Sequence, residues 1–279
     1  MNDAPWRFLP YRVLRAAENM AIDEAVFRLN RREGLPPTLR FFGWRPPAVS
    51  LGYFQKTGRE IDVGACRRAG IDIVRRPTGG KAVLHEHELT YSLVAPADHP
   101  LFTGDIVGTY RVVSACIVEA LRRLGLSPEV AFEGRSAAGT ALEGYCFAAP
   151  SRYELLVGGR KICGSAQVRA GGAFLQHGSL LADMDPARTA SVMGVSVDGV
   201  AKTTTTLREQ LGRDIGYEDL ARLLRGAFED TLGIRLAEGG LSPAEVSLKE
   251  RLMAEKYGTD RWNLEGKGGS DDPGGAADA

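Results

Sequence analysis

The sequence predicts an α/β protein, because short apolar runs typical of strands alternate along the chain with segments typical of helices. Residues 71–74 and 89–95 are apolar runs of the strand type. Residues 106–124 place Val113, Ile117 and Leu121 at helical spacing. A chain that carries both patterns combines helices and sheets around one core, as α/β and α+β proteins do.

The other elements follow from the same two patterns. The additional helices that we expect are 16–30, 61–69, 217–232 and 242–257. The additional strands that we expect are 6–13, 38–42, 48–54, 82–85, 153–157, a strand opened by Lys161, and 173–181. Because 38–42 and 48–54 flank Gly43–Pro47, we expect these two strands to form a hairpin with a long loop.

Composition excludes several classes of protein. With 279 residues, 44% of them hydrophobic, the chain can bury a sizeable core. Lys plus Arg equals Asp plus Glu at 35 each, so no overall field attracts nucleic acid or an anionic membrane. No stretch approaches the roughly 18 uninterrupted apolar residues of a membrane span, and the first residues do not resemble a signal peptide. We therefore expect a cytoplasmic protein that binds neither nucleic acid nor membrane.

One stretch combines a possible nucleophile, a cation and a glycine-rich turn. Residues 153–157 are predicted to form a strand, and Gly158-Gly159 is a two-residue hairpin signal. Lys161 opens the returning strand, while Cys146 follows the small, polar loop 133–144. A hairpin that folds back on itself could bring the lysine near that cysteine.

Such a pair would have chemical consequences. A free cysteine with a pKa of about 8.5 is only roughly 3% thiolate at pH 7, and the thiolate is the nucleophile. A nearby ammonium lowers that pKa. The alternative is that Cys146 is a small loop hydrophobe and Lys161 a solvated charge at a strand end. The remaining cysteines, 66, 116 and 163, show neither metal-type spacing nor a dense disulfide pattern.

A second informative loop follows the strand 71–74. It reads Arg75-Arg76-Pro77-Thr78-Gly79-Gly80-Lys81. Paired glycines let backbone N–H groups approach an anion or a carbonyl, although the Walker spacing is missing. Downstream, His85 and His87 would share one face of a strand, but two ligands do not fill a zinc shell. We therefore favour a polar turn there and expect no metal.

Three long motifs resemble those of the biotin/lipoate protein ligase and octanoyltransferase superfamily. They are Arg75-Arg76-Pro77-Thr78-Gly79-Gly80 with His85 and Glu88-Leu89-Thr90-Tyr91-Ser92, then Gly159 to Gln167, then Leu175 to Leu181. Cys146-Phe147 with Pro150-Ser151 and Tyr153-Glu154-Leu155 resembles the LipM-type octanoyltransferases. The likeness covers most of the chain. It departs from the family at Lys81 and at Glu86-His87.

The resemblance implies mixed β-sheets flanked by helices, the biotin/lipoate-ligase catalytic-domain fold. It implies one catalytic domain over 1–264 (core about 33–248), with a C-terminal helical segment over 242–264 and a disordered tail over 265–279. Cys146 is implied to be the acyl-thioester nucleophile and Lys161 the cation that lowers its pKa, without cofactor or metal. The implied substrate-binding residues are Arg75, Arg76, Gly79, Gly80, His85, Gly164, Ser165, Ala166, His177 and Gly178.

The implied reaction moves an octanoyl group from octanoyl-acyl carrier protein to a lysine of a lipoyl domain, such as that of glycine cleavage H protein. It would be the first step of endogenous lipoate assembly. The alternatives are an ATP-dependent lipoate ligase, an amidotransferase between lipoyl domains, and a non-catalytic lipoyl-domain binding module. The context of Cys146 argues against the ligase, and a binding module would not need both Cys146 and Lys161.

Overall fold

A computed structural model describes residues 5–57, 61–102, 105–131 and 154–266. Cys146, the loop 133–144, Tyr153 and the predicted tail from 267 onward lie outside these ranges. The strands are β1 (Trp6–Leu14), β2 (Thr38–Trp44), β3 (Ala48–Leu51), β4 (Asp72–Arg75), β5 (Val83–His85), β6 (Glu88–Pro96), β7 (Pro128–Ala131), β8 (Glu154–Val157), β9 (Arg160–Ala170), β10 (Ala173–Leu181) and β11 (Leu236–Glu238).

The helices include four longer ones and several short segments. They are α1 (Ala16–Asn30), α3 (Val63–Arg68), α4 (Ile106–Arg123), α5 (Pro186–Met193), α6 (Val197–Thr203), α7 (Leu207–Leu211), α8 (Tyr217–Leu232), α9 (Pro243–Leu252) and α10 (Asp260–Asn263). Two further turns are the 3₁₀ helix η1 (Pro100–Phe102) and the π-helix η3 (Met253–Tyr257). The predicted α/β class is confirmed.

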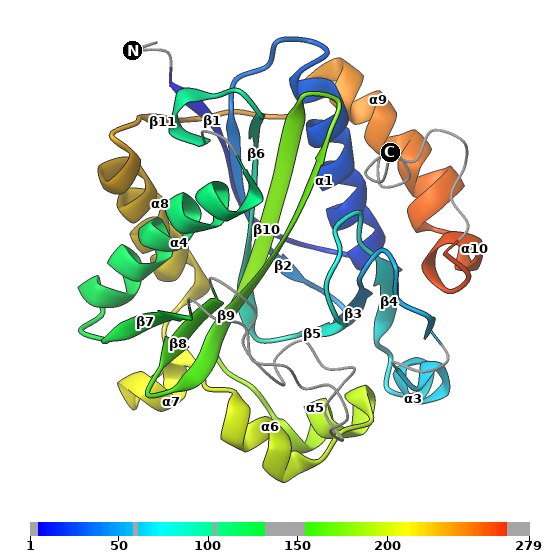
Figure 1. The fold of residues 1–279 in the computed structure, drawn as a ribbon. Coiled ribbons are helices and arrows are strands. Elements are labelled where there is room, and N and C mark those ends of the chain that lie inside the picture. The colour runs from blue at the N-terminus through cyan, green and yellow to red at the C-terminus, as the bar shows by residue number, and fades with distance from the viewer. Residues whose placement is uncertain (1–4, 58–60, 103–104, 132–153, 267–279) are drawn as a thin grey trace.

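Two sheets organise the described residues (Figure 1). The larger sheet has eight strands in the order β11-β1-β2-β6-β10-β9-β8-β7, and the smaller has the order β4-β3-β5. In the larger sheet β1 runs parallel to β2 and β11, and the other neighbours run antiparallel. In the smaller sheet β3 runs parallel to β4 and antiparallel to β5. Both sheets are therefore mixed, as the resemblance implied.

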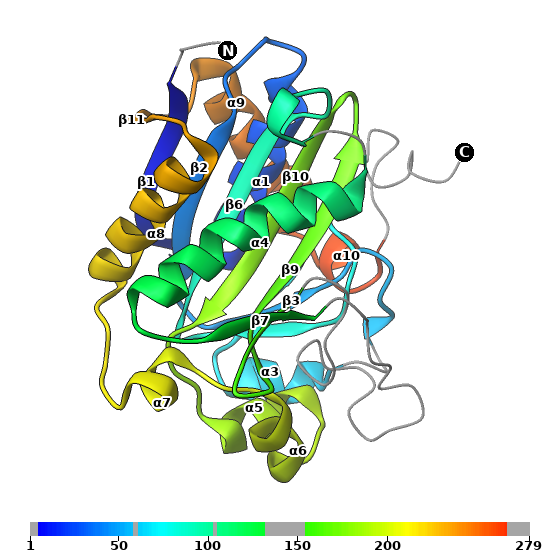
Figure 2. The same cartoon turned by 60° about the vertical axis from the view of Figure 1, so that its left-hand side comes forward.

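Helices cover both faces of the larger sheet. Figures 1 and 2 show α4 and α8 on one face and α1 with α9 on the other. The core under α4 and α8 contains Phe41, Tyr91 and Phe228. The core under α1 contains Val26, Phe27 and Leu175. α4 and α8 form where the sequence offers an apolar stripe that the sheet can bury, whereas α1 is buried on most sides, between the sheet and α9.

The predicted hairpin between residues 38–42 and 48–54 is wrong. β2 pairs with β1 and β6 in the larger sheet, whereas β3 pairs with β4 and β5 in the smaller one. The second strand is also shorter than expected, because it ends at Leu51, before Gly52. Short apolar runs identify strands, but the partners are chosen by contacts that are distant in sequence.

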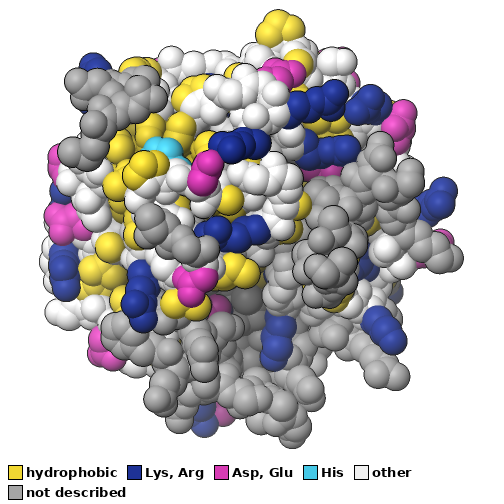
Figure 3. All heavy atoms as spheres, turned by 45° about the horizontal axis from the view of Figure 1, so that its top comes forward, with side chains coloured by type: hydrophobic (Ala, Val, Ile, Leu, Met, Phe, Trp, Pro, Cys, Tyr) yellow, Lys and Arg dark blue, Asp and Glu magenta, His cyan; other side chains and the backbone are white. Residues whose placement is uncertain are grey.

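The surface carries charges of both signs. Figure 3 shows lysine and arginine, aspartate and glutamate, and hydrophobic side chains together on one face, in keeping with equal numbers of basic and acidic residues over the whole chain. No helix in the described ranges is long and apolar enough to cross a membrane.

A glycine contact joins β3 to the loop after β4, and it gives a stability prediction. A Cβ on Gly52 would overlap the carbonyl oxygen of Gly80, whereas a Cβ on Gly79 would meet no atom within 4 Å. We expect Gly52→Ala to lower the free energy of unfolding by about 1–3 kcal/mol, because backbone must move to accept the methyl group. Gly79→Ala, the matched control, should change it by less than about 0.5 kcal/mol. Equal urea midpoints for the two variants would contradict the described packing.

Candidate active site

The register of β9 and β10 gathers several of the expected site residues. Ala166 lies opposite His177, and Ser165 lies opposite Gly178. The hydroxyl Oγ1 of Thr78 is 2.7 Å from Nε2 of His177, which fastens the loop after β4 to the larger sheet. The Gly79-Gly80 turn therefore lies beside β9 and β10, at the junction of the two sheets.

His177 belongs to a buried chain of polar side chains. Its Nδ1 is 3.2 Å from Oδ2 of Asp23 on α1, and Oδ1 of Asp23 accepts from Nη1 of Arg40 at 2.7 Å. Burial lowers the pKa of His177 and outweighs the opposite effect of Asp23. The neutral imidazole then donates from Nδ1 to Asp23 and accepts from Thr78 at Nε2. His177 thus positions the glycine loop, and the sequence did not reveal Asp23 as its partner.

The Arg76 guanidinium holds the glycine loop together by donating hydrogen bonds to its backbone. Its Nη2 donates to the carbonyl oxygens of Gly79 and Lys81, each at 2.8 Å. Its Nη1 donates to the carbonyl and the hydroxyl of Ser50 on β3, at 3.0 and 3.1 Å. Gly80 adopts a φ of +92°, which side-chain-bearing residues rarely adopt. The described contacts of Arg76 shape a loop whose backbone can approach a substrate closely.

Arg75, in contrast, has a structural role. It is 1% exposed, and Nη1 donates to the carbonyl oxygens of Gly52 and Gln55 at 2.9 and 2.7 Å. Its Nε donates to the carbonyl oxygen of Trp262 at 3.1 Å. These donors hold α10 against β4. These contacts give Arg75 a role in the fold, and its part in substrate binding stays a prediction.

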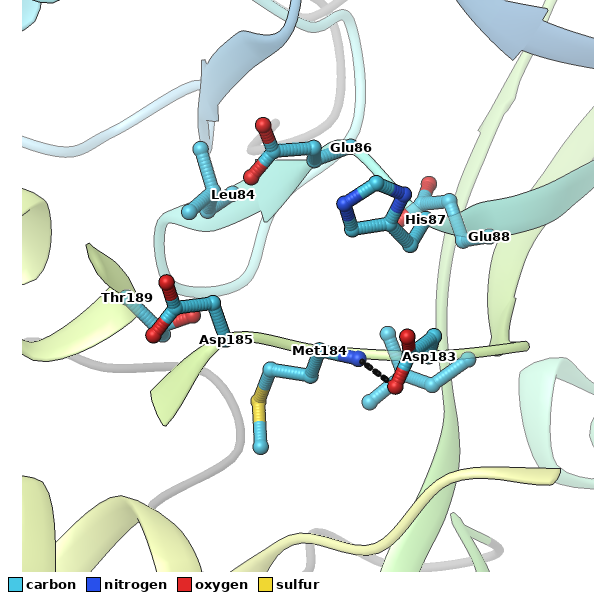
Figure 4. A pocket seen from close by; sticks show the side chains of 9 residues that line it. Leu84, Glu86, His87, Glu88, Asp183, Met184, Asp185 and Thr189 are labelled. Atoms are coloured by element: carbon cyan, nitrogen blue, oxygen red, sulfur yellow. Dashed lines mark hydrogen bonds between the residues drawn. The ribbon is translucent and has the colours of Figure 1, made fainter. Parts of the chain in front are cut away.

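His85 is also engaged by the protein. Nε2 is 2.7 Å from Oγ of Ser50, Nδ1 is hydrogen-bonded to Glu88, and the indole ring of Trp44 stacks on the imidazole at 4.1 Å. His87 does not join it, because it lies exposed in the turn before β6 and lines a small cavity with Glu86 and Asp183 (Figure 4). Within the described ranges no group of three His, Cys, Asp or Glu side chains could hold a metal.

Ser165 and Gly178 face the other side of the sheet. Oγ of Ser165 is 2.7 Å from the hydroxyl of Tyr91, which packs against Phe228 of α8. A Cβ on Gly178 would lie 2.5 Å from that Oγ, so glycine is required for this contact. The structure therefore divides the expected residues between two faces, with the Ser165 side chain opposite to that of His177.

Lys161 is buried, with 1% of its side chain exposed. Its Nζ lies 2.5 Å from Oε1 of Glu154, across the β8–β9 hairpin. The alternative that Lys161 is a solvated strand-end charge is therefore wrong. Glu154 was not predicted as its partner, although a carboxylate at the start of an apolar strand is a signal that could have found it. A buried charge persists when an opposite charge and hydrogen bonds compensate it.

The three described cysteines are poor nucleophiles. Burial raises the pKa of Cys66, and it raises the pKa of Cys116 and of Cys163 to about 12. For Cys163 the charge of Lys161 acts in the opposite direction, but burial is the larger effect. At pH 7 a thiol of pKa about 12 is ionised in roughly one molecule in 10⁵. No described cysteine is therefore ready to attack a thioester.

These features can be set beside those of known proteins. Residues 15–229 match the lipoyl protein ligase A/B catalytic domain. A lipoate-protein ligase A bound with ATP superposes with a TM-score of 0.78 at 27% identity, over 94% of this chain and 99% of that one. The ligase of a bi-partite archaeal lipoylation system from Thermoplasma acidophilum gives 0.78 at 25% identity, over 96% and 100%. The chain belongs to the lipoyl protein ligase A/B catalytic-domain family.

Proteins of similar sequence show to which group within this family the chain belongs. The chain is 42% identical to octanoyltransferase LipM of Kyrpidia tusciae, over 92% of this chain and 98% of that protein. It is 40% identical to octanoyltransferase LipM of Geobacillus kaustophilus, over 93% and 98%. Within the wider family it is a member of the LipM octanoyltransferases, and thus an acyltransferase of lipoate biosynthesis.

The burial of the described cysteines predicts a labelling pattern. At pH 7.5, iodoacetamide should leave Cys66, Cys116 and Cys163 of the native protein unmodified, because each thiol is buried and its pKa raised. Any single rapid carbamidomethyl group should map to Cys146, and all four cysteines should react after unfolding in urea. Peptide mapping by mass spectrometry measures both states. Rapid labelling of Cys163 in the folded protein would contradict the described site.

The lowered pKa of His177 predicts how stability depends on pH. In the unfolded chain the imidazole takes up a proton below about pH 6.5, while the folded protein keeps it neutral. Its contribution to stability is therefore present above about pH 6.5 and is lost as the pH falls, by up to about 1.4 kcal/mol per pH unit. Urea unfolding of the wild type and of His177→Gln between pH 7.5 and 5.5 should show a shallower loss in the variant. Parallel curves would show that His177 does not titrate in this way.

Proposed function

We propose that this chain transfers an octanoyl group from octanoyl-acyl carrier protein to a lysine amine of a lipoyl domain, through a thioester on Cys146. The observation that carries the proposal is the contrast among the cysteines. The three described thiols are buried with raised pKa values. Cys146 is the remaining cysteine of the sequence, and it lies in the motif that resembles the LipM octanoyltransferases.

The reaction proceeds in two half-reactions. The thiolate of Cys146 attacks the carbonyl carbon of the donor thioester, a new C–S bond forms and the donor C–S bond breaks. The sulfur of the carrier protein leaves as a thiolate and takes up the proton that Cys146 gave up. The neutral amine of the acceptor lysine then attacks the acyl-enzyme. The C–N bond forms, the C–S bond breaks, and the proton that the amine gives up goes to the released thiolate of Cys146 as the amide is produced. Each carrier protein can dock in turn.

Lys161 is proposed to supply the positive charge that stabilises the thiolate. Its ammonium is buried and held at 2.5 Å by Glu154, so it cannot swing freely into solvent. Fixed charges in a site with little water act more strongly than the same charges in bulk solvent. Glu154 is then a positioning residue, because it fixes the ammonium rather than contacting substrate. The Gly79-Gly80 turn and Gly164 are proposed to offer backbone N–H groups to the acyl carbonyl.

An ATP-dependent ligase is the second candidate, because the fold neighbours at 25–27% identity are lipoate-protein ligases. Steady-state kinetics separate the two functions. The transferase should work with octanoyl-acyl carrier protein without ATP, and double-reciprocal plots at several acceptor concentrations should run parallel. Intersecting lines, or a requirement for ATP and free octanoate, would move the assignment to the ligase.

Variants of the ion pair test the role of Lys161. Lys161→Met should lower turnover about 10²–10³-fold, because it removes the charge that stabilises the thiolate. The same change leaves Glu154 buried beside an apolar group, which costs about 3–5 kcal/mol of stability. The double variant with Glu154→Gln should regain stability but not turnover.

Cys146→Ser and Cys146→Ala complete this comparison. Both should fold normally and lose transfer by about 10³-fold or more, because the nucleophile is absent. Cys66→Ala and Cys116→Ala are the matched controls, since they remove buried cysteines of α3 and α4. They should lower stability and retain turnover. Full activity in Cys146→Ala would end the covalent mechanism.

A further inference from the structure

A cleft of about 450 Å³ opens where the ends of β1 and β2 meet the start of β6 and the N-terminus of α8. Figure 2 shows α8 beside β1 and β2. The walls of the cleft carry four carboxylates, three aromatic rings and one guanidinium. None of the residues that we place in acyl transfer lines this cleft. Its volume lies in the range of small-molecule sites.

Glu88, which lines the cleft, has one oxygen that the protein does not satisfy. The residue is 2% exposed. Its Oε1 accepts from the hydroxyls of Thr90 and Ser179, both at 2.7 Å, and is hydrogen-bonded to His85. Its Oε2 is buried and has no hydrogen-bond partner among the described residues. A buried carboxylate oxygen without a partner is costly, so a donor that reaches it, from a water molecule or a bound group, would be stabilising.

A smaller cavity on the other side of the turn before β6 also includes Glu88. Figure 4 shows Glu86 and His87 of this turn with Asp183 and Met184 around it. Its volume is about 20 Å³, enough for a single water molecule. Any larger ligand that reaches Glu88 must therefore occupy the 450 Å³ cleft.

Aromatic rings form another wall of the cleft. Tyr11 of β1 and Tyr217 of α8 stack with their ring centroids 5.8 Å apart and their planes 9° from parallel. The charge of Glu88 contributes, after burial, to raising the pKa of Tyr217 to about 12 and the pKa of Tyr11. The Glu88 carboxylate therefore lies near enough to the hydroxyl groups of Tyr11 and Tyr217 for its charge to act on both. Carboxylate and aromatic rings together favour an organic cation.

The charges around the cleft favour a cation over an anion. Glu86 is paired with Arg188 and Asp219 with Arg222, at 3.0 and 2.8 Å. In the described part of the chain Glu88 pairs with His85 and with no lysine or arginine, and Glu218 forms no ion pair. Arg45 is the one lysine or arginine that lines the cleft. The N-terminus of α8 would attract an anion, but Glu218 and Asp219 already occupy its first turn.

A metal ion fits this cleft less well than an organic cation. The described residues include no group of three His, Cys, Asp or Glu side chains arranged to hold one. Two tyrosine rings and a tryptophan also suit a carbon chain better than a bare ion.

We propose that this cleft binds an alkylammonium group, with the Glu88 carboxylate as its counter-charge and the Tyr11–Tyr217 pair against its carbon chain. The site stands apart from acyl transfer, so the proposal does not depend on the role of Cys146. Because Glu88 also bonds His85, and His85 bonds Ser50 next to Arg76, the ligand would sit at the end of the polar network that reaches the glycine loop.

Isothermal titration with n-butylammonium chloride tests the proposal on the full chain, with 1-butanol as the uncharged control. We expect saturable binding of n-butylammonium that weakens with added NaCl, and none of 1-butanol. Glu88→Gln keeps the shape and the acceptor of Oε1, and it should weaken binding about tenfold or more. Tyr217→Leu should weaken it several-fold. Glu250→Gln, an exposed carboxylate of α9, is the matched control and should bind as the wild type does.

Several results would overturn the proposal. They are equal binding of n-butylammonium by Glu88→Gln and the wild type, equal binding of 1-butanol, or no saturable heat at all. Circular dichroism and thermal unfolding establish that each variant is folded. If Glu88→Gln fails to fold, Tyr217→Leu decides, because Tyr217 lies outside the buried network of Glu88. Unchanged binding in that variant would then refute the site.

Discussion

The contact between Thr78 and His177 is the interaction on which the arrangement of the site depends. It joins the loop between β4 and β5 of the small sheet to β10 in the large sheet, at 2.7 Å in a buried environment. Asp23, held by Arg40, fixes the other nitrogen of the imidazole. This series of hydrogen-bonded side chains therefore connects α1, β2, β10 and the glycine loop. A change in any of these elements would move the backbone N–H groups of Gly79-Gly80.

Charge compensation is a second constraint on the site. Lys161 and Glu154 bury opposite charges across one hairpin, and Arg75 and Arg76 direct buried guanidinium groups to backbone carbonyls. The described cysteines differ from these paired charges, because burial keeps their thiols protonated and uncharged. Burial thus keeps the three described thiols protonated and unreactive, and the pairing with Glu154 fixes the position of the Lys161 ammonium. This difference in electrostatic environment is what a single reactive cysteine requires.

Local patterns in the sequence predicted most long elements but not their partners. α1, α8 and β10 match their predicted bounds, because each carries a pattern long enough to read. α5, α6 and α7 were missed, since five to eight residues give too little periodicity. Their N-caps, among them Asp185 and Ser196, were the available signals. The pairing of β2 and β3 with distant strands has no local signature.

The candidate site was predicted in part. The motifs identified the glycine loop, His177 and Lys161, and the structure brings the first two together. The partners that give these residues their roles, Asp23 and Glu154, were not identified. Asp23 lies 154 residues from His177, so no local pattern links the two, whereas Glu154 was open to prediction from its place at the start of the strand paired with Lys161. Arg75 shows the converse, since this residue of the same motif donates to the carbonyl oxygen of Trp262 and holds α10 in place. Cys146 lies outside the described residues, so its assignment continues to depend on sequence and on the state of the other thiols.

The most direct measurement is the intact mass of the protein after incubation with octanoyl-acyl carrier protein, without ATP and without an acceptor. We expect one octanoyl adduct per chain, mapped to Cys146 and removed by hydroxylamine, as a thioester would be. Addition of a lipoyl domain should discharge the adduct and octanoylate the acceptor lysine. The absence of an adduct during active turnover, or an adduct on another residue, would contradict the account.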